Sequence, residues 1–149
     1  MAEDIKFRHT MPVQIRFSDV DQFGHMNNSV YFSLYDLAKT TYIKDVLGSA
    51  DWSKLAIVVA NINANFFMPV FFSDHLVIET ALVHLGHKSF TLLQRAVTTD
   101  THEVKCECRT VMVGYDLATK EPKLISEDYK EAICRYEEKT LEELSKERK

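Results

Sequence analysis

Residues 29–47 constrain the fold most strongly, because they form a long helical pattern with apolar side chains on most of its sides. The principal apolar positions recur at intervals of three and four residues: Tyr31, Leu34, Tyr35, Ala38, Tyr42 and Val46. Four more extend the apolar surface around the cylinder: Val30, Phe32, Leu37 and Ile43. Gly48 stands where a C-terminal cap would end the helix. A helix that is apolar on most sides is expected to be buried.

The other segments predict an antiparallel sheet. A first strand covers residues 11–18, and residues 58–72 (VVANINANFFMPVFF) then alternate apolar side chains with asparagines until Pro69 interrupts. Three more segments are rich in Val, Ile, Thr and Phe and are joined by short links: 75–85, 88–99 and 104–115. Residues 126–147, with Ser126 as N-cap, predict a peripheral amphipathic helix. The expected fold is α+β, a curled antiparallel sheet of about five strands around a long central helix.

The composition favours one domain over residues 1–149. The chain has 149 residues, of which 46% are hydrophobic and 27% charged, and this is enough for a real core. Its formal charge of −4 and pI near 5.8 argue against a nucleic-acid or membrane-surface partner, because both need a basic field. The sequence shows no signal peptide and no membrane-spanning run, so we expect a cytoplasmic protein.

The cysteines indicate reduced thiols. Cys106, Cys108 and Cys134 are an odd number without the spacing of a disulfide framework. Cys106 and Cys108 are two residues apart in a predicted strand, so they share one face as small core residues. A structural zinc site needs a second pair of ligands, which His102 alone does not supply. We expect no metal and no cofactor.

Polar side chains concentrate at the junction before the helix. Residues 18–29 hold two aspartates, a glycine, a histidine and two asparagines. The chain has no G-x-S-x-G elbow, Walker loop, G-x-G-x-x-G turn or H-E-x-x-H helix, so serine-hydrolase, nucleotide-binding and zincin chemistry lack their usual motifs. The chemistry is therefore expected at this junction.

Two stretches resemble a known family. SDVDQFGHMNNSVYFSLYDLAK closely resembles the D-x-D-x-x-G-H-x-N-N-x-x-Y-x-x-x-[FWY]-[DE]-x-A-[RK] signature of hotdog-fold acyl-CoA thioesterases of the 4-hydroxybenzoyl-CoA thioesterase family. FFMPVFFSDHLVIETALVHLGHKSF resembles the same family's strand, Pro, turn, strand and Gly-x-x-Ser segment. The resemblance covers residues 10–135 and implies a hotdog fold that hydrolyses an acyl-CoA or acyl-carrier-protein thioester.

The resemblance implies that Asp21, the second aspartate of the D-x-D pair, is the catalytic carboxylate. Thioester hydrolysis needs an oxygen nucleophile and a group that stabilises the oxyanion. Asp21 can attack to form an anhydride or deprotonate a water, and the sequence leaves both routes open. The N–H groups at the helix start, around residues 27–29, can hold the oxyanion. Asp19 is assigned a structural role in the turn.

His25 is the second catalytic candidate. A related branch of acyl-thioesterases uses the histidine at this position in catalysis, and its near-neutral reference pKa suits a general acid. That branch has a catalytic asparagine where this chain has Phe23, and a histidine that caps the helix is the alternative. The predicted substrate-binding residues are Gly24, Asn27, Asn28, Ser29 and Ser89. Gly24 permits a positive φ, one asparagine is expected as N-cap, and Ser89 is either near the thioester or an exposed strand hydroxyl.

Other residues suggest ligand contacts and assembly. Six aromatic residues either line an acyl tunnel or fill the core: Phe66, Phe67, Phe71, Phe72, Tyr31 and Tyr35. Cations available for the phosphates of CoA are Lys54, Lys88, Arg95 and Arg109. Asp36 and Lys39 predict an ion pair or a partner contact. The strand bearing Asn61, Asn63 and Asn65 has an edge to protect, and hotdog relatives pair such strands, so we expect a homodimer or a homotetramer.

Two other functions suit the same fold. A hotdog hydratase or dehydratase uses a differently placed histidine and carboxylate, usually beside a G-D-x-N-P-[LIV]-H segment that this chain lacks. A non-catalytic acyl-thioester binding module would not need the carboxylate that Asp21 retains. Thioester hydrolysis is therefore the expected activity.

Overall fold

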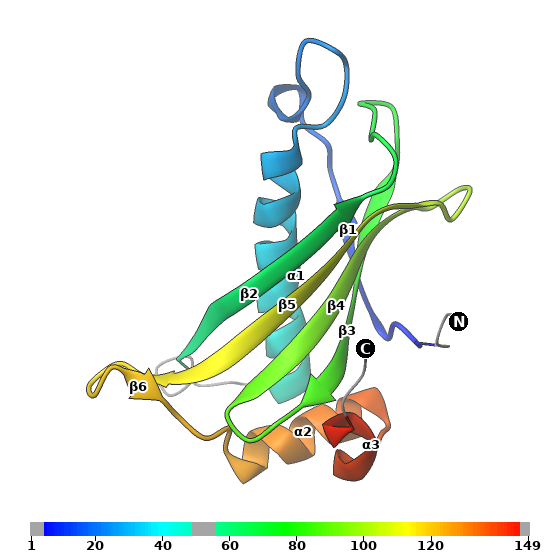
Figure 1. Ribbon diagram of the computed structural model, residues 1–149. Helices are drawn as coiled ribbons and strands as arrows, with labels where there is room; N and C mark the ends of the chain where they lie inside the picture. Colours follow the sequence, from blue (N-terminus) through cyan, green and yellow to red (C-terminus); the bar gives the residue numbers. More distant parts are fainter. Residues whose placement is uncertain (1–4, 49–55, 147–149) are drawn as a thin grey trace.

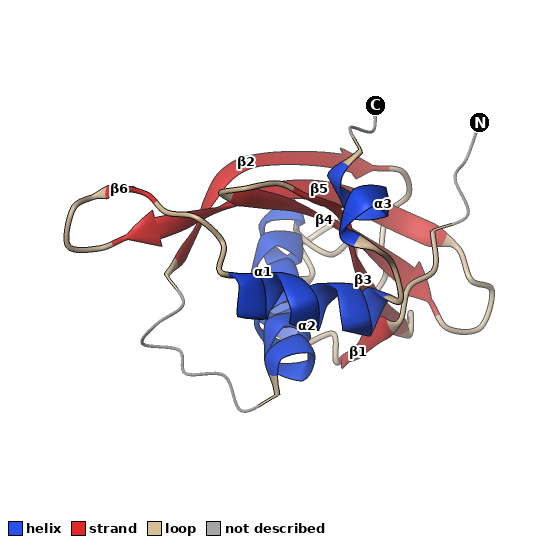
Figure 2. Ribbon diagram, turned by 90° about the horizontal axis from the view of Figure 1, so that it is seen from below, coloured by secondary structure: helices blue, strands red, loops and turns tan. Residues whose placement is uncertain are grey.

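The computed structural model of the protein describes residues 5–48 and 56–146. Its sheet is antiparallel and six-stranded, in the order β1-β3-β4-β5-β2, with the short β6 paired to β5. The strands are β1 (His9–Val13), β2 (Ile57–Phe66), β3 (Leu76–Leu85), β4 (Ser89–Thr98), β5 (Val104–Asp116) and β6 (Glu121–Pro122). The sheet curls over the long helix α1 (Asn28–Leu47), while α2 (Glu127–Glu137) and α3 (Leu141–Ser145) lie at one end of it (Figure 1, Figure 2). This confirms the expected hotdog architecture.

Helix α1 has the predicted length and caps. The side chain of Asn27 accepts a hydrogen bond from the N–H of Ser29, and Gly48 follows the last turn with φ of +68°. Burial of this helix is narrower than predicted, because Phe32 and Leu37 are exposed. The buried stripe consists of Tyr31, Tyr35, Ala38, Lys39 and Tyr42. The chain therefore covers one side of α1 and leaves the opposite side open.

The first strand differs from its predicted bounds of 11–18. β1 ends at Val13, and a single 3-10 turn, η1, follows at Phe17–Asp19. The carboxylate of Asp19 accepts a hydrogen bond from the backbone N–H of Arg16 at 2.8 Å. This local bond closes a turn in place of a strand ladder, as short acidic side chains often do.

The C-terminal region also departs from the prediction of one helix over 126–147. Ser126 caps α2 as expected, but Glu138 adopts a left-handed conformation with φ of +55°. The side chains of Thr140 and Glu143 then form a capping box that starts α3. Leu144 is fully buried as a result. The chain turns back here because α3 covers apolar surface of the sheet that a straight helix would leave in water.

Strand β2 is a free edge with a clear inner face. Ile62 pairs with Thr110 and Phe66 pairs with Cys106, and both β5 partners are buried toward α1. Asn61, Asn63 and Asn65 point to the other face, as the alternation predicted. The strand ends at Phe66, before Met68, so the predicted alternation runs two residues too far. Within the described residues, no helix is long and apolar enough to cross a membrane.

Candidate active site

Asp21 lies in a tight turn that fixes one of its carboxylate oxygens. Its Oδ1 accepts hydrogen bonds from the backbone N–H of Phe23 at 2.9 Å and of His25 at 3.3 Å. The backbone N–H of Gly24 donates to the carbonyl of Asp21, and Gly24 has φ of +83°, as predicted. No described residue donates a hydrogen bond to Oδ2. The turn therefore orients the carboxylate and leaves one oxygen available.

The start of α1 supplies a backbone donor close to this carboxylate. The N–H of Asn27 donates to the carbonyl of Asp19 at 2.9 Å, and the N–H of Ser29 donates to the side chain of Asn27 at 3.0 Å. The N–H of Asn28 has no acceptor among residues 5–48 and 56–146. Of the three predicted oxyanion donors, the fold thus leaves Asn28 free, at the positive end of the helix dipole.

Asp21 and Asn28 line the same pocket. This pocket has a volume of about 390 Å³, and its other lining residues are His25, Met26, Asn27, Tyr31, Phe66, Phe67, Met68 and Pro69. Phe66, Phe67 and Tyr31 were predicted as lining residues. Met26, Met68 and Pro69 were not predicted to line it. The only sequence signal for Met68 and Pro69 was the break in alternation at Pro69.

His25 contributes to the turn through its backbone. Its N–H bonds to the Asp21 carboxylate and its carbonyl accepts from the Asp21 N–H at 2.8 Å. Its imidazole packs edge-on against Phe71, with the ring centroids 5.1 Å apart. The half-buried ring also borders the pocket, so it can approach a ligand bound there.

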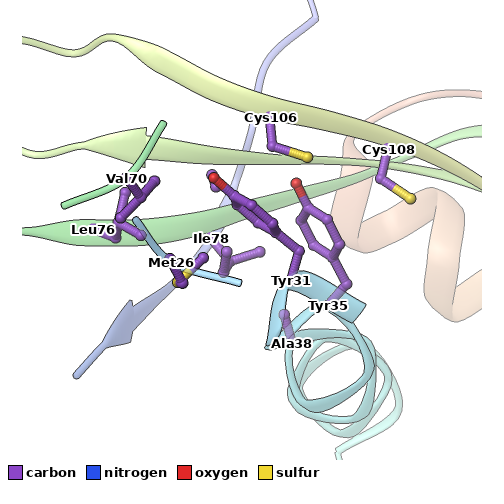
Figure 3. Packing of buried hydrophobic residues seen from close by; sticks show 10 residues of the cluster. Met26, Tyr31, Tyr35, Ala38, Val70, Leu76, Ile78, Cys106 and Cys108 are labelled. Carbon is purple, nitrogen blue, oxygen red and sulfur yellow. The ribbon is translucent and has the colours of Figure 1, made fainter. Parts of the chain in front are cut away.

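The core behind the pocket is uncharged. Tyr31 and Tyr35 stack with ring centroids 6.2 Å apart and project from α1 toward the strand that carries Cys106 and Cys108 (Figure 3). Burial raises the pKa of both tyrosines, and burial raises the pKa of Cys106 to about 11. All three groups are therefore neutral at physiological pH. Tyr31, the one of these residues that lines the pocket, therefore offers a neutral surface that suits an apolar acyl group.

Two predicted residues lie apart from the pocket. Asp19 is buried, with its Oδ1 2.9 Å from Nη2 of Arg16, and the hydrogen bond from Arg16 lowers the pKa of Asp19. Its structural role is confirmed. Ser89 starts β4 at the opposite end of the sheet, on the rung of Val113 and Val58. A single chain therefore does not bring Ser89 to Asp21.

The predicted phosphate-binding cations are dispersed. Arg95 is engaged by Glu79 at 2.8 Å and lies over the ring of Phe7. Lys88, in the turn before β4, and Arg109 of β5 do not line the pocket. Lys54 lies outside the described residues. Among the described residues, no group of three or more His, Cys, Asp or Glu side chains is arranged to hold a metal ion. The free cysteines are consistent with the predicted reduced thiols.

Comparison with known proteins identifies what the chain resembles. The model of the thioesterase-like superfamily matches residues 15–133. The long-chain acyl-CoA thioesterase FadM of Escherichia coli is 27% identical over 124 residues, which cover 81% of this chain and 93% of FadM.

Solved structures give the same picture. A thioesterase from Thermus thermophilus, complexed with coenzyme A and Zn, superposes with a TM-score of 0.80 at 26% identity, covering 91% of this chain and 98% of that one. A 1,4-dihydroxy-2-naphthoyl-CoA thioesterase from Synechocystis has a TM-score of 0.74 at 16% identity, covering 84% of this chain and 94% of that one, and shows the shared fold.

Proposed function

The chain belongs to the thioesterase-like superfamily, and from this premise we propose that it hydrolyses acyl-CoA thioesters to a free carboxylate and CoA. The observation that carries the proposal is the shared pocket of Asp21 and Asn28. It combines a carboxylate that has a free oxygen with a backbone donor at a helix N-terminus. FadM and the Thermus thioesterase support CoA, rather than an acyl-carrier protein, as the thiol of the substrate.

In the proposed reaction the thioester carbonyl points at the N–H of Asn28. In one route Asp21 takes a proton from a water, whose oxygen attacks the carbonyl carbon, and the carbon–sulfur bond then breaks. The departing thiolate of CoA recovers the proton from Asp21. In the other route Asp21 attacks directly, CoA leaves, and water hydrolyses the resulting anhydride. In both routes the Asn28 N–H stabilises the oxyanion, and such a donor contributes about 2.7–4 kcal/mol.

The test is CoA release from a panel of acyl-CoAs, measured with a thiol reagent. Asp21→Asn keeps an oxygen for the turn but removes the charge, and we expect kcat to fall about 10²–10⁴-fold, the usual contribution of a general base. Asp100→Asn is the matched control, because the Oδ1 of Asp100 also accepts a backbone hydrogen bond, from Thr101, in a turn between strands. Equal activity of Asp21→Asn and the wild type would refute the proposal.

A single turnover in ¹⁸O-labelled water separates the two routes. If Asp21 is the nucleophile, hydrolysis of the anhydride can place ¹⁸O in the peptide that contains Asp21. If Asp21 is the base, the label enters only the released fatty acid. Mass spectrometry of the digested enzyme distinguishes these outcomes.

The free edge of β2 supports a homodimer, with a homotetramer as its higher assembly. β2 is an outermost strand, and Val58, Val59, Ile62 and Phe66 are exposed on it. Exposed, apolar edge strands are commonly covered by pairing. Antiparallel pairing across a two-fold axis would set the Ile57 end of one β2 beside the Phe66 end of the other. The second protomer's Ser89 would then approach the pocket, because Ser89 shares the rung of Val58.

Light scattering tests the assembly, and a mass of one 17.2 kDa chain would refute it. Hybrid dimers test the role of Ser89. A hybrid of Asp21→Asn and Ser89→Ala protomers contains one intact site only if the two residues come from different protomers. Recovery of activity on mixing the two variants is the expected result.

A further inference from the structure

Lys39 is a buried cation that the proposed reaction does not use. It lies in the middle of α1 and its side chain is 6% exposed. Its Nζ is 3.1 Å from Oδ1 of Asp36, whose side chain is 69% exposed. Asp36 is its only charged partner among the described residues. Desolvating an ammonium group is costly, so this position calls for a reason beyond packing.

The Lys39–Asp36 pair borders a second pocket, of about 280 Å³. The rest of its lining is mostly apolar and includes Ile43 of α1, Ile57 and Val59 of β2 and Met112 of β5. Thr40 completes the lining. The pocket therefore combines one donor and one acceptor of opposite charge with hydrocarbon walls.

Both pockets have lining residues from α1 and β2. The surface between them, here called the α1–β2 face, carries Phe32, Asp36 and Lys39 of α1 and Val59, Ile62 and Phe66 of β2. The active-site pocket uses Tyr31 and Phe66 of the same two elements, and Phe32 packs edge-on against Phe66 between the pockets. The exposed inner side chains of β2 continue from one pocket toward the other. An acyl chain that leaves the active site toward Lys39 would lie against these apolar side chains.

We propose that the Lys39–Asp36 pair binds a hydroxyl group at the far end of the substrate's acyl chain. Asp36 can accept the hydroxyl proton while Lys39 donates to the hydroxyl oxygen. A terminal carboxylate fits less well, because Asp36 already neutralises Lys39 and would repel a second negative charge. A terminal methyl group would displace water from the exposed Asp36 carboxylate without offering a hydrogen bond in return. The inference rests on the proposed hydrolysis at Asp21.

The helix geometry sets the length of this substrate. Lys39 follows Asn28 by eleven residues, which corresponds to about 16 Å along the axis. Its side chain leans back toward the helix N-terminus, which shortens the span by up to about one turn of 5.4 Å. An extended carbon chain advances about 1.2 Å per bond, as an extended backbone does. The expected acyl group therefore has about 10–14 carbons.

The experiment compares kcat/KM for 12-hydroxydodecanoyl-CoA, dodecanoyl-CoA and dodecanedioyl-CoA. For the wild type we expect the hydroxylated substrate to exceed the methyl-terminated one at least about tenfold, the effect of a hydrogen bond to a charged group. Lys39→Met keeps an unbranched side chain that is one atom shorter and removes its charge, and it should bring this ratio near one. Lys44→Met is the matched control, because Lys44 is an exposed lysine of the same helix, and it should leave the ratio unchanged.

Asp36→Asn provides a second variant if Lys39→Met fails to fold, because Asp36 is exposed. It should lower the preference for the hydroxyl and improve the relative rate of the dicarboxylate. Equal wild-type rates on the hydroxylated and methyl-terminated substrates would overturn the inference and leave the proposed hydrolysis intact. A wild-type preference for the dicarboxylate would overturn it too.

Two further outcomes separate the sources of failure. If no acyl-CoA of any length is hydrolysed, the proposed function fails and the inference fails with it. If Lys39→Met changes the mass by light scattering while the wild-type ratio is already near one, the α1–β2 face is covered by a second copy of the chain. That result would overturn the assignment to substrate.

Discussion

The N-terminal end of α1 is open, whereas its C-terminal end is sealed. At the open end Phe17, Phe23 and Phe72 are 83%, 73% and 52% exposed, and Asp21 borders a pocket. At the sealed end α2 covers the helix, and α3 packs against α2 and β3 (Figure 2). Tyr42 is buried there and donates a hydrogen bond to Glu137, the last residue of α2.

Glu137 explains how the sealed end accommodates polar groups. Its Oε2 also accepts a hydrogen bond from the backbone N–H of Leu82 at 3.0 Å. The pairing of β1 with β3 stops at His9, so β1 does not reach Leu82 of β3. The Glu137 carboxylate therefore accepts a hydrogen bond from a backbone N–H that the short edge strand leaves unpaired. The Tyr42 hydroxyl, the Leu82 N–H and the Glu137 carboxylate at this end are therefore paired with one another within the fold. At the open end Asp21 and Asn28 keep free hydrogen-bonding capacity, which is what a ligand site requires.

Truncating a phenylalanine at each end tests this comparison most strongly. Phe90 is 3% exposed in the cluster around Tyr42, so Phe90→Ala should lower the free energy of unfolding by about 3–5 kcal/mol. Phe23→Ala keeps the backbone N–H that bonds to Asp21 and should change stability by less than about 0.5 kcal/mol. Urea unfolding measures both, and similar losses would contradict the distinction between the two ends.

Tyr42→Phe removes the hydroxyl that donates to the buried Glu137. Leaving a buried acceptor short of a donor should cost about 1–3 kcal/mol. A double-mutant cycle with Glu137→Gln isolates the pair, and we expect the two changes to be non-additive. Additive losses would mean that the hydrogen bond contributes nothing beyond packing.

Asn27→Ala removes the N-cap of α1 at the open end. The expected loss of stability is about 1 kcal/mol. Asn27→Ser retains a capping oxygen and should recover most of it. The N–H of Ser29, which would lose its acceptor, is next to the N–H of Asn28, the proposed oxyanion donor. CoA release should therefore fall as well, and the serine variant should restore it. A loss that Asn27→Ser does not recover would assign Asn27 another role.

The pH dependence of stability should reflect Glu137. Burial raises the pKa of this carboxyl group, so its contribution is complete at low pH and is lost as the pH rises through the raised value. Glu137→Gln removes this dependence. As the pH rises from 4 to 8, the free energy of unfolding of the variant should therefore increase relative to that of the wild type. Thermal unfolding across this range measures the difference, which should be the smallest of these effects. A constant difference would contradict it.

Local sequence signals predicted the parts of the fold that local interactions control. The ends of α1 follow from Asn27 and Gly48, and α2 begins at Ser126, because a cap depends on neighbours within a few residues. β3, β4 and β5 were placed to within one residue at each end for a similar reason, since strand composition and turns are local. The division of the C-terminal helix was missed, because it depends on apolar surface offered by a distant sheet.

The site was predicted in part. Asp21, His25, Asn27 and Asn28 belong to one short segment, so one turn and one helix start necessarily bring them together. Met68 and Pro69 were missed because they reach the pocket only through the pairing of β2 with β5. Ser89 was predicted to bind substrate together with the residues of the junction, but within a single chain it lies at the opposite end of the sheet.

By itself, the sequence determined the order of elements, the caps of the long helix and the polar junction before it, since each depends on residues close together in the chain. Only the tertiary structure decided which side of α1 is covered, which oxygen of Asp21 stays free, and why Lys39 and Glu137 are buried. The physical reason is that burial and pairing are set by segments far apart in sequence. Lys39 comes to line a pocket with residues of β2 and β5, and Glu137 meets β3, only after the sheet has curled over the helix.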